Sequence, residues 1–297
     1  MNAAQTLSDQ GFFARFSRAI RHPLRSTYIL WSRVFPNTPL PLRLPFGVWW
    51  LAGNDYSGSV IREGSFENSE FRFVQRYLEP GMTVLDIGAH HGFYTLLAST
   101  RIGPNGRVHA FEPSPRERGA LLRHLKWNAL SNVSVYAVAL GKEAKPGQLF
   151  VVDRHQTGCN SLRPPASDVL EGATPTPVEV ITLDGWVSEH HIASADFAKL
   201  DVEGGELDVL KGASKFLEHR PRPVFLIEVQ EIRTENWGYR AGEVIRLLAD
   251  RGFRWFSLQP DGSLHPLNID LPQFEGNYVA WPEERDPQRL ATFVRNN

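Results

Sequence analysis

The sequence predicts an α/β fold in which a mostly parallel central sheet is covered by helices on both faces. Strand-like and helix-like segments alternate between residues 67 and 230, a pattern typical of a parallel sheet. Residues 224–227 are apolar throughout, as expected of a central strand that is buried on both faces. In residues 83–92 an apolar strand ends in an acid and a glycine turn. Ligands of such sheets bind beyond the carboxyl ends of the strands, so this turn predicts a binding site.

Residues 1–66 are expected to form an extension to the main domain, which would cover residues 67–297. Residues 1–34 contain five arginines and a single acid, Asp9, with apolar residues at near-helical spacing. Such a segment either makes a weak contact with a membrane surface or packs as a helix with its arginines in water. Residues 35–60 are rich in proline and aromatic residues and predict a short hairpin.

Turn residues and apolar spacing define the elements of the main domain in order. A helix is predicted where apolar residues recur every three or four positions, and the first one ends at Pro80-Gly81. Strands are predicted where short apolar runs lie between glycine-containing or proline-containing turns. In chain order the expected elements are helix 67–78, strand 83–87, helix 93–99, strand 107–111, helix 117–130, strand 133–140, strand 149–152, strand 178–182, helix 185–189, strand 198–202, helix 206–217 and strand 224–229.

Two segments depart from this alternation. Residues 153–177 are rich in Pro, Gly, Ser and Thr, and we expect this long loop to form a substrate lid. After a helix at 241–248, strands at 253–258 and 277–281 lie on either side of the turn Asp261-Gly262. They predict an antiparallel hairpin at the edge of the sheet.

The composition excludes several classes of protein. The formal net charge is −1, which gives no overall electrostatic footprint for nucleic acid, so no nucleic-acid partner is expected. The single cysteine, Cys159, excludes an internal disulfide and a cysteine-rich zinc site. No apolar run approaches the ~20 residues that span a bilayer, and the N-terminus lacks the apolar core of a secretory signal. A cytoplasmic location is therefore expected.

The first glycine turn favours a particular kind of ligand. The segment Asp86-x-Gly88-x-x-x-Gly92 lacks the middle glycine of the dinucleotide loop Gly-x-Gly-x-x-Gly, so no pyrophosphate is expected against its backbone. Asp86, the acid of this segment, favours a positively charged ligand. Glu112 ends the next strand, about 20 residues further on, where an acid binds ribose hydroxyls. Asp201 ends a later strand at the same edge of the predicted sheet.

These acids together predict a nucleoside that carries a positive charge and no phosphate, and S-adenosyl-L-methionine fits that description. The alternative is a sheet protein whose acids at the strand ends merely cap helices.

Several segments together resemble the FkbM-type methyltransferases, from about Glu67 to Glu231. The resemblance implies a class I methyltransferase Rossmann-like fold and O-methyl transfer from S-adenosyl-L-methionine to sugars and natural products. One departure is His90-His91, where relatives often carry Asn or another small polar residue. The matching segments are Val84-Leu85-Asp86-Ile87-Gly88-Ala89, Phe111-Glu112-Pro113, Ala139-Leu140-Gly141, Thr157-Gly158-x-x-Ser161-Leu162, Thr182-Leu183-Asp184 and, most distinctively, Lys199-x-Asp201-Val202-Glu203-Gly204-x-Glu206.

The resemblance also implies the roles of individual positions. The loop 86–92 would hold the methionine part of the cofactor, Glu112 the ribose, and Val138 and Ala139 the adenine. Asp201 would face the sulfonium and the acceptor. The full set of expected cofactor-binding residues is Asp86, Gly88, Ala89, His90, Gly92, Tyr94, Glu112, Pro113, Val138, Ala139 and Asp201.

Methyl transfer requires the acceptor oxygen, the methyl carbon and the sulfur to be aligned, and a hydroxyl acceptor also loses a proton to a base. Asp201 and Glu203 are the expected catalytic residues, and Asp201 is the first choice. They are considered together because residues two apart in an extended strand share a face. Glu203 could instead cap the following helix. No metal is expected, although Asp201, Glu203 and Glu228 offer an alternative magnesium site. His155 is a second candidate base.

Three functions are compared at this point. The leading one is an O-methyltransferase that acts on a hydroxyl of a small molecule, a glycan or a secondary metabolite. A nucleic-acid methyltransferase of the same fold is a second, but the chain lacks an Asn/Asp-Pro-Pro-Tyr type signature. The third is a cofactor-binding module without turnover, which the presence of Asp86, Glu112 and Asp201 argues against. The sequence does not identify the acceptor.

Overall fold

The computed structural model describes residues 31, 34, 35, 38–53, 55–64, 66–152, 158–164 and 172–295. The chain divides into two compact units, residues 1–66 and 67–297. In the smaller unit, strands β1 (Leu40–Arg43) and β2 (Trp49–Ala52) form an antiparallel hairpin, followed by helix α3 (Tyr56–Glu63). The basic segment 1–34 lies almost entirely outside the described residues, so its contact with a membrane surface stays a prediction.

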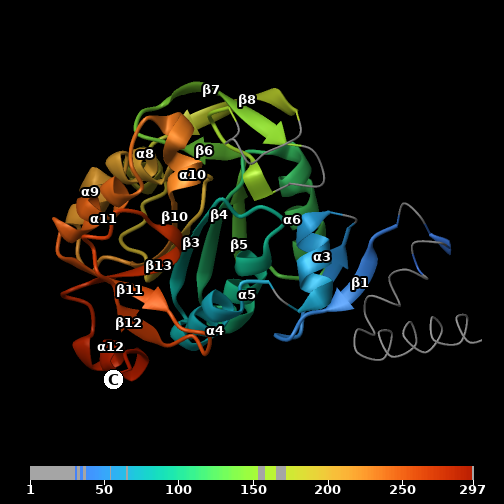
Figure 1. Cartoon of the computed structure of the whole chain (residues 1–297). Helices are drawn as coiled ribbons and strands as arrows, with labels where there is room; N and C mark the ends of the chain where they lie inside the picture. Colours follow the sequence, from blue (N-terminus) through green and yellow to red (C-terminus); the bar gives the residue numbers. More distant parts are fainter. Residues whose placement is uncertain are drawn as a thin grey trace, which may run out of the picture. The chain divides into compact units, whose positions relative to one another are not determined.

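The larger unit is built on an eight-stranded sheet with the strand order β12-β11-β13-β10-β9-β3-β4-β5 (Figure 1). The five strands from β10 to β5 run parallel, and β13, β11 and β12 are antiparallel additions at one edge. This order confirms the predicted α/β class and its antiparallel C-terminal hairpin. The strands are β3 (Thr83–Ile87), β4 (Arg107–Phe111), β5 (Val133–Tyr136), β9 (Phe197–Leu200), β10 (Val224–Gln230), β11 (Phe253–Leu258), β12 (Leu264–Pro266) and β13 (Glu275–Pro282).

Helices lie on both faces of this sheet (Figure 1). On one face Tyr77 of α4 packs against Phe197 of β9, Trp281 of β13 and Phe293 of α12. No helix among the described residues is both long and apolar enough to cross a membrane. The helices of the larger unit are α4 (Asn68–Tyr77), α5 (Phe93–Ile102), α6 (Pro115–Trp127), α7 (Leu183–Glu189), α8 (Glu206–Lys211), α9 (Ser214–Glu218), α10 (Glu231–Thr234), the 3-10 helix η2 (Glu235–Trp237), α11 (Gly242–Ala249) and α12 (Pro287–Phe293).

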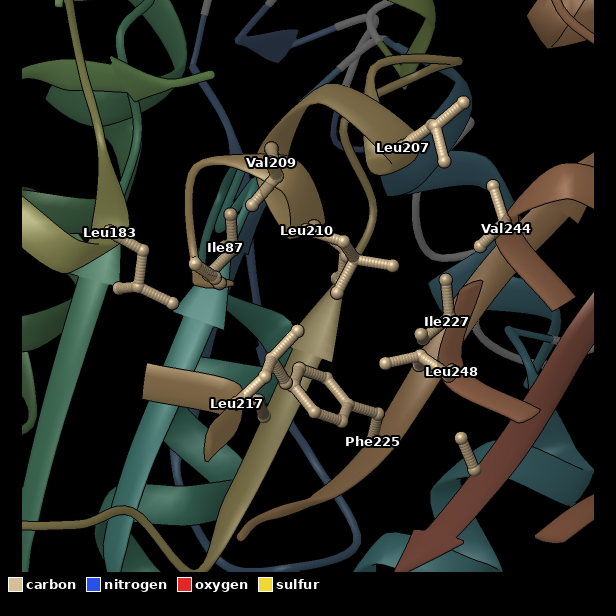
Figure 2. Close-up of a cluster of buried hydrophobic side chains, with 14 of the residues drawn as sticks. Ile87, Leu183, Leu207, Val209, Leu210, Leu217, Phe225, Ile227, Val244 and Leu248 are labelled. Carbon is tan, nitrogen blue, oxygen red and sulfur yellow. The ribbon is translucent and has the colours of Figure 1, made fainter. Parts of the chain in front are cut away.

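A large apolar cluster fills the space between the sheet and helices α8, α9 and α11. Figure 2 shows Phe225 and Ile227 of β10 beside Leu210 of α8 and Leu248 of α11. Because side chains alternate along a strand, the residues between these cluster members lie on the other face of the sheet. The cluster thereby fixes which side chains of β3, β9 and β10 face α4 and α5.

Three expected strands contribute to a second sheet, which has the order β6-β8-β7. Residues 133–140 form β5 and a separate strand β6 (Val138–Leu140), which pairs with β8 (Ala173–Ile181) and not with the central sheet. Strand β8 also pairs antiparallel with β7 (Lys145–Val152). The placement of residues 178–182 in the alternating central set was therefore wrong. Alternation along the chain cannot show which sheet receives a strand, because pairing is decided by distant residues.

The predicted lid is shorter than expected because β8 already begins at Ala173. Its residues 153–157, with His155, and 165–171 lie outside the described residues. The predicted helix 206–217 is broken into α8 and α9 at Gly212. A Cβ at this glycine would lie 2.1 Å from the carbonyl oxygen of Gly141, so a close approach of two backbones explains both the glycine and the break.

A matched pair of glycines tests the packing of the loop after β3. Gly88 has φ +87, and a Cβ there would lie 1.7 Å from the carbonyl oxygen of Asp201, whereas Gly81 has φ +86 and nothing within 4 Å. Gly81→Ala should cost only about 1–2 kcal/mol for the left-handed conformation. Gly88→Ala should lower the free energy of unfolding further, because the backbone of Asp201 must move. Urea unfolding measures both variants, and equal losses would contradict the close approach.

Candidate functional site

The residues that follow β3, β4, β9 and β10 meet at one edge of the sheet. These strands are parallel neighbours, and the carboxyl ends of parallel strands lie at the same edge. The backbone N–H of Asp201 donates to the carbonyl oxygen of Ile87 at 3.0 Å. The loop after β9 is thus bound directly to the end of β3.

The glycine loop after β3 is held by its neighbour β4. The backbone N–H groups of Gly88 and Ala89 both donate to the carbonyl oxygen of Phe111 at 3.0 Å. His90 has φ 51, a left-handed conformation that is uncommon outside glycine. A Cβ on Gly92 would lie 2.3 Å from Cδ1 of Leu121 in α6, so this glycine permits close packing where α5 begins.

Glu112 lies at the end of β4 and is buried, with 5% of its surface exposed. Its carboxylate accepts hydrogen bonds from the backbone N–H groups of His90 (2.7 Å) and Ser114 (2.8 Å). Burial raises the pKa of Glu112 to about 8. A carboxylate can accept about four hydrogen bonds, so two sites remain for ligand hydroxyls. Its role as ribose ligand stays a prediction.

The other expected nucleoside contacts lie beside Glu112. Arg118 donates to the carbonyl oxygens of Glu112 and Pro113, which fixes the turn between β4 and α6. The two residues expected to line the adenine, Val138 and Ala139, lie on β6 in the smaller sheet. Ala139 is buried and Val138 is half-buried.

Asp86 is buried beneath the glycine loop, with 2% of its surface exposed. One carboxylate oxygen accepts a 2.5 Å hydrogen bond from the hydroxyl of Thr95 in α5. The other oxygen, Oδ1, is buried and has no hydrogen-bond partner in the part of the chain that the structure describes. Burial raises the pKa of this carboxyl group. The structure thus places Asp86 toward α5, and its contact with the methionine part stays a prediction.

Lys199 is a central residue of the site, although it is not among the predicted site residues. It is 4% exposed, and its Nζ lies 2.5 Å from Oδ2 of Asp201. The same ammonium lies 4.9 Å from the centre of the Tyr94 ring, and the hydroxyl of Tyr94 donates to Glu67 at 2.5 Å. Burial alone would lower the pKa of Lys199, but the carboxylates of Asp201, Glu67 and Asp86 raise it above its ordinary value.

The signal for Lys199 was its position in the motif, two residues before Asp201 on the same face of the strand. Burial raises the pKa of Glu67 to about 7. Nothing local in the sequence connects Glu67 with the site, because the link runs through Tyr94.

Three acids converge beside Lys199. Oxygen atoms of Asp201, Glu203 and Glu228 lie within 4.8 Å of one another. The expected reason, a shared face in an extended strand, was wrong: β9 ends at Leu200 and Glu203 has φ 56. A turn brings the two acids together instead. Burial and repulsion by Glu228 and Asp201 raise the pKa of Glu203 well above its ordinary range, and burial and Asp201 do the same for Glu228.

This arrangement brings Glu228 to the other two acids, as the magnesium alternative requires. However, Nε of Arg233 lies 2.9 Å from Oε2 of Glu203, and Lys199 pairs with Asp201. Two cations therefore already balance two of the three acids, and a metal ion would have to displace them. We do not assign the three acids as metal ligands.

The histidine pair forms a second close group, in which ring nitrogens of His90 and His91 lie within 4.8 Å of Glu117. The two imidazole rings are stacked, with centroids 4.0 Å apart and planes at 18°. Nitrogen lone pairs lie in the ring planes, so nearly parallel rings do not direct them at one ion. Glu117 is also paired with Arg116 at 2.6 Å. This group is not assigned as a metal site either.

The loop after Asp201 is held by Glu206 and not by Glu203. The carboxylate of Glu206 accepts from the backbone N–H groups of Val202 (3.0 Å) and Gly204 (3.2 Å). Burial raises the pKa of Glu206 to about 7. These amides belong to the loop and not to the first turn of α8. The described contacts of the Glu203 carboxylate are with Arg233 and the other two acids, and they include no amide of that helix.

The described part of the predicted lid lies over this loop. The hydroxyl of Ser161 donates to the carbonyl oxygen of Glu203 at 2.7 Å, and Asn236 donates to the carbonyl oxygen of Pro164 at 3.2 Å. The guanidinium of Arg163 lies 5.5 Å from the centre of the Trp237 ring. Residues 158–164 and η2 thus border the loop that carries Glu203.

Much of the larger unit is similar in sequence to known methyltransferases. The model of the methyltransferase FkbM domain matches residues 86–255. Methyltransferase sdnD of Sordaria araneosa is 28% identical over 198 residues, covering 57% of this chain and 73% of the relative. The 2-O-methyltransferase NoeI of Sinorhizobium fredii is 26% identical over 170 residues, covering 53% and 68%.

Methyltransferase 1 of Beauveria bassiana is 26% identical over 143 residues, and the match spans 57% of that relative's length and 43% of this chain. Among solved structures, an O-methyltransferase from Bacillus cereus gives a TM-score of 0.43 at 15% identity, covering 72% of this chain and 79% of that one.

The raised pKa of Glu112 predicts that ligand binding depends on pH. At neutral pH a carboxyl group with a pKa of about 8 is mostly protonated. Ribose hydroxyls that donate to it favour its ionised form, so binding should release a proton, and the affinity should rise from about pH 6 to about pH 8 and then level off. Calorimetry in buffers of different ionisation enthalpy measures this release.

The suitable probe is 5′-methylthioadenosine, which keeps the ribose and lacks a titrating amino group. Glu112→Gln is the control, in which the pH dependence should disappear. Proton release that persists in this variant would show that another group is responsible.

Proposed function

Because the chain belongs to the FkbM methyltransferase family, we propose that it methylates a hydroxyl group of a small molecule or a glycan. The protein is an S-adenosylmethionine-dependent methyltransferase with a Rossmann-like fold. The proposal of a hydroxyl acceptor rests on one observation, the ion pair between Asp201 and Lys199 next to two further acids. This pair provides a base at the point where the cofactor loop and the acid group meet.

The residues at the edge of the sheet fit the cofactor. Gly88 allows the backbone of the first loop to approach Asp201 closely, and Glu112 retains acceptor sites for two ribose hydroxyls. When bound, S-adenosyl-L-methionine supplies an electrophilic methyl group on a positively charged sulfur. The carboxylate of Asp201 stabilises a positive charge placed beside it.

Asp201 is the proposed general base. Lys199 occupies Oδ2 of Asp201, which leaves Oδ1 to accept the proton of an acceptor hydroxyl. The side chain of Asp201 is 22% exposed, whereas that of Lys199 is 6% exposed, so the carboxylate reaches the open edge while its partner stays buried. Glu203 is the second catalytic candidate, because its carboxylate lies within 4.8 Å of the carboxylates of Asp201 and Glu228.

The acids also favour an acceptor that carries several hydroxyl groups. Oxygen atoms of Asp201, Glu203 and Glu228 lie within 4.8 Å of one another, and each carboxylate can accept hydrogen bonds from hydroxyl groups. The relative NoeI is named as a 2-O-methyltransferase, which supports a hydroxyl acceptor. Nucleic acid remains a poor candidate, because the chain has a formal net charge of −1.

The function is tested in two steps. Calorimetry with S-adenosyl-L-methionine should show binding, and transfer of a labelled methyl group should then be detected on a member of a panel of sugars, glycans and hydroxylated secondary metabolites. Absence of binding would contradict the cofactor assignment. Transfer to RNA or DNA alone would contradict the proposed acceptor class, and binding without transfer to any acceptor would favour a binding module.

Asp201→Asn separates catalysis from binding. Loss of a general base should lower kcat by about 10²–10⁴-fold, while the affinity for the cofactor changes less, because the asparagine keeps the shape of the side chain. The matched control is Asp250→Asn, an exposed aspartate at the end of α11. If cofactor affinity falls more than kcat, Asp201 is a cofactor ligand and not the base.

Treatment with a chelator tests whether Asp201, Glu203 and Glu228 act without a metal ion or as ligands of a magnesium ion. Since Arg233 and Lys199 already balance Glu203 and Asp201, turnover should persist after exhaustive treatment with EDTA. Loss of turnover that returns on addition of Mg²⁺ would show that the three acids act as metal ligands.

A further inference from the structure

We propose that Lys199 is a positioning residue for methyl transfer, whose buried ammonium group fixes the orientation of the Asp201 carboxylate toward the reacting atoms. The inference rests on the proposed function, because it concerns the residue assigned there as the base. Lys199 is assigned as a positioning residue and not as a catalytic one, because its side chain is 6% exposed and its ammonium group is bound to Asp201, whose side chain is 22% exposed.

The register of the sheet places Lys199 on the face opposite the large apolar cluster. Lys199 is paired with Asp86 of β3 and with Leu226 of β10, whereas its neighbours Ala198 and Leu200 belong to that cluster. Two positions after Lys199 and Leu226 on this face come Asp201 and Glu228. The register therefore determines which acids surround the ammonium group.

The ammonium group is held in place from several sides. Tyr94 presents the face of its ring at 4.9 Å, a favourable cation–π distance. The ring is itself anchored, because its hydroxyl donates to Glu67 at 2.5 Å. Asp86 is the register partner of Lys199 on the neighbouring strand and attracts its charge, and its carboxylate accepts a hydrogen bond from Thr95 on the same helix as Tyr94. These contacts give Lys199 a single defined position.

The fixed ammonium group of Lys199 orients Asp201 through one short hydrogen bond. Nζ of Lys199 donates to Oδ2 of Asp201 at 2.5 Å, and a charge-assisted bond of this length restricts the torsion angles of the carboxylate. Asp201 lies beyond the last residue of β9, beside Glu203 with its left-handed backbone. The acids Glu203 and Glu228 repel it, so without Lys199 the carboxylate would turn away from them.

Kinetics of two variants provide the first test. Lys199→Met keeps much of the length of the side chain and removes the charge, whereas Lys199→Arg keeps the charge. Misplacement of a reacting group by about 1 Å can cost about 100-fold in rate, so kcat of Lys199→Met should fall by about 100-fold with little change in cofactor affinity. Lys199→Arg should recover part of this loss, and Lys211→Met, which removes an exposed lysine, should behave as the unaltered protein. An unchanged kcat in Lys199→Met would overturn the proposal.

Crystal structures of the unaltered protein and of Lys199→Met provide a test that needs no acceptor. The carboxylate of Asp201 should adopt a different rotamer in Lys199→Met and keep its position in Lys199→Arg. An unmoved carboxylate in Lys199→Met would overturn the proposal whatever the kinetics show. Because this result does not depend on turnover, failure of the proposed function and failure of the positioning role can be told apart.

If Lys199→Met does not fold because it lacks the buried ammonium group, a second substitution that removes a nearby acid should restore folding. Glu67→Gln combined with Lys199→Met removes one of the acids whose charge Lys199 offsets, and the amide oxygen of the glutamine can still accept the hydrogen bond from Tyr94. The same two measurements on this double variant then decide the proposal.

Discussion

The ion pair between Lys199 and Asp201 is the interaction on which the site depends. It joins the end of a central strand to the loop that carries the acids, and Lys199 is enclosed by Asp86, Glu67 and the ring of Tyr94. Desolvating two charges costs several kcal/mol per ion, so two apolar residues would stabilise the fold at least as well. A buried pair at the carboxyl edge of the sheet is better explained by the chemistry of that edge than by stability.

Strained backbone marks the two loops that meet at this pair. His90 and Glu203 have φ values of 51° and 56°, conformations that cost about 1–3 kcal/mol in residues other than glycine. Each of these loops is held by a nearby carboxylate. The backbone N–H of His90 donates to Glu112, and Glu206 accepts hydrogen bonds from two backbone N–H groups in the loop of Glu203. The surrounding carboxylates therefore hold the left-handed backbone of these two loops in place.

The local pattern of the sequence was enough to predict the sheet and its ligand edge, because apolar runs and turn residues report burial directly. It could not place β6 and β8 in a second sheet, nor the break at Gly212, because both depend on backbone contacts between distant segments. The same limit applies to the site. Glu67 reaches Lys199 only through Tyr94, and the position of Glu228 follows from the register of β10 against β9.

An excess of buried carboxyl groups gives the site its electrostatic character. Glu67, Glu112 and Glu206 have pKa values raised to between about 7 and 8, so at neutral pH much of the negative charge is held back as protonated acid. Donors or a positive charge placed nearby would draw these groups toward ionisation. The site can thus take up a cationic ligand by releasing protons, which needs no metal ion to balance the acids. Backbone contacts of the sheet fix the loop expected to hold the cofactor, so under the proposed function we expect the segments that border the loop of Glu203, residues 158–164 and η2, to select the acceptor.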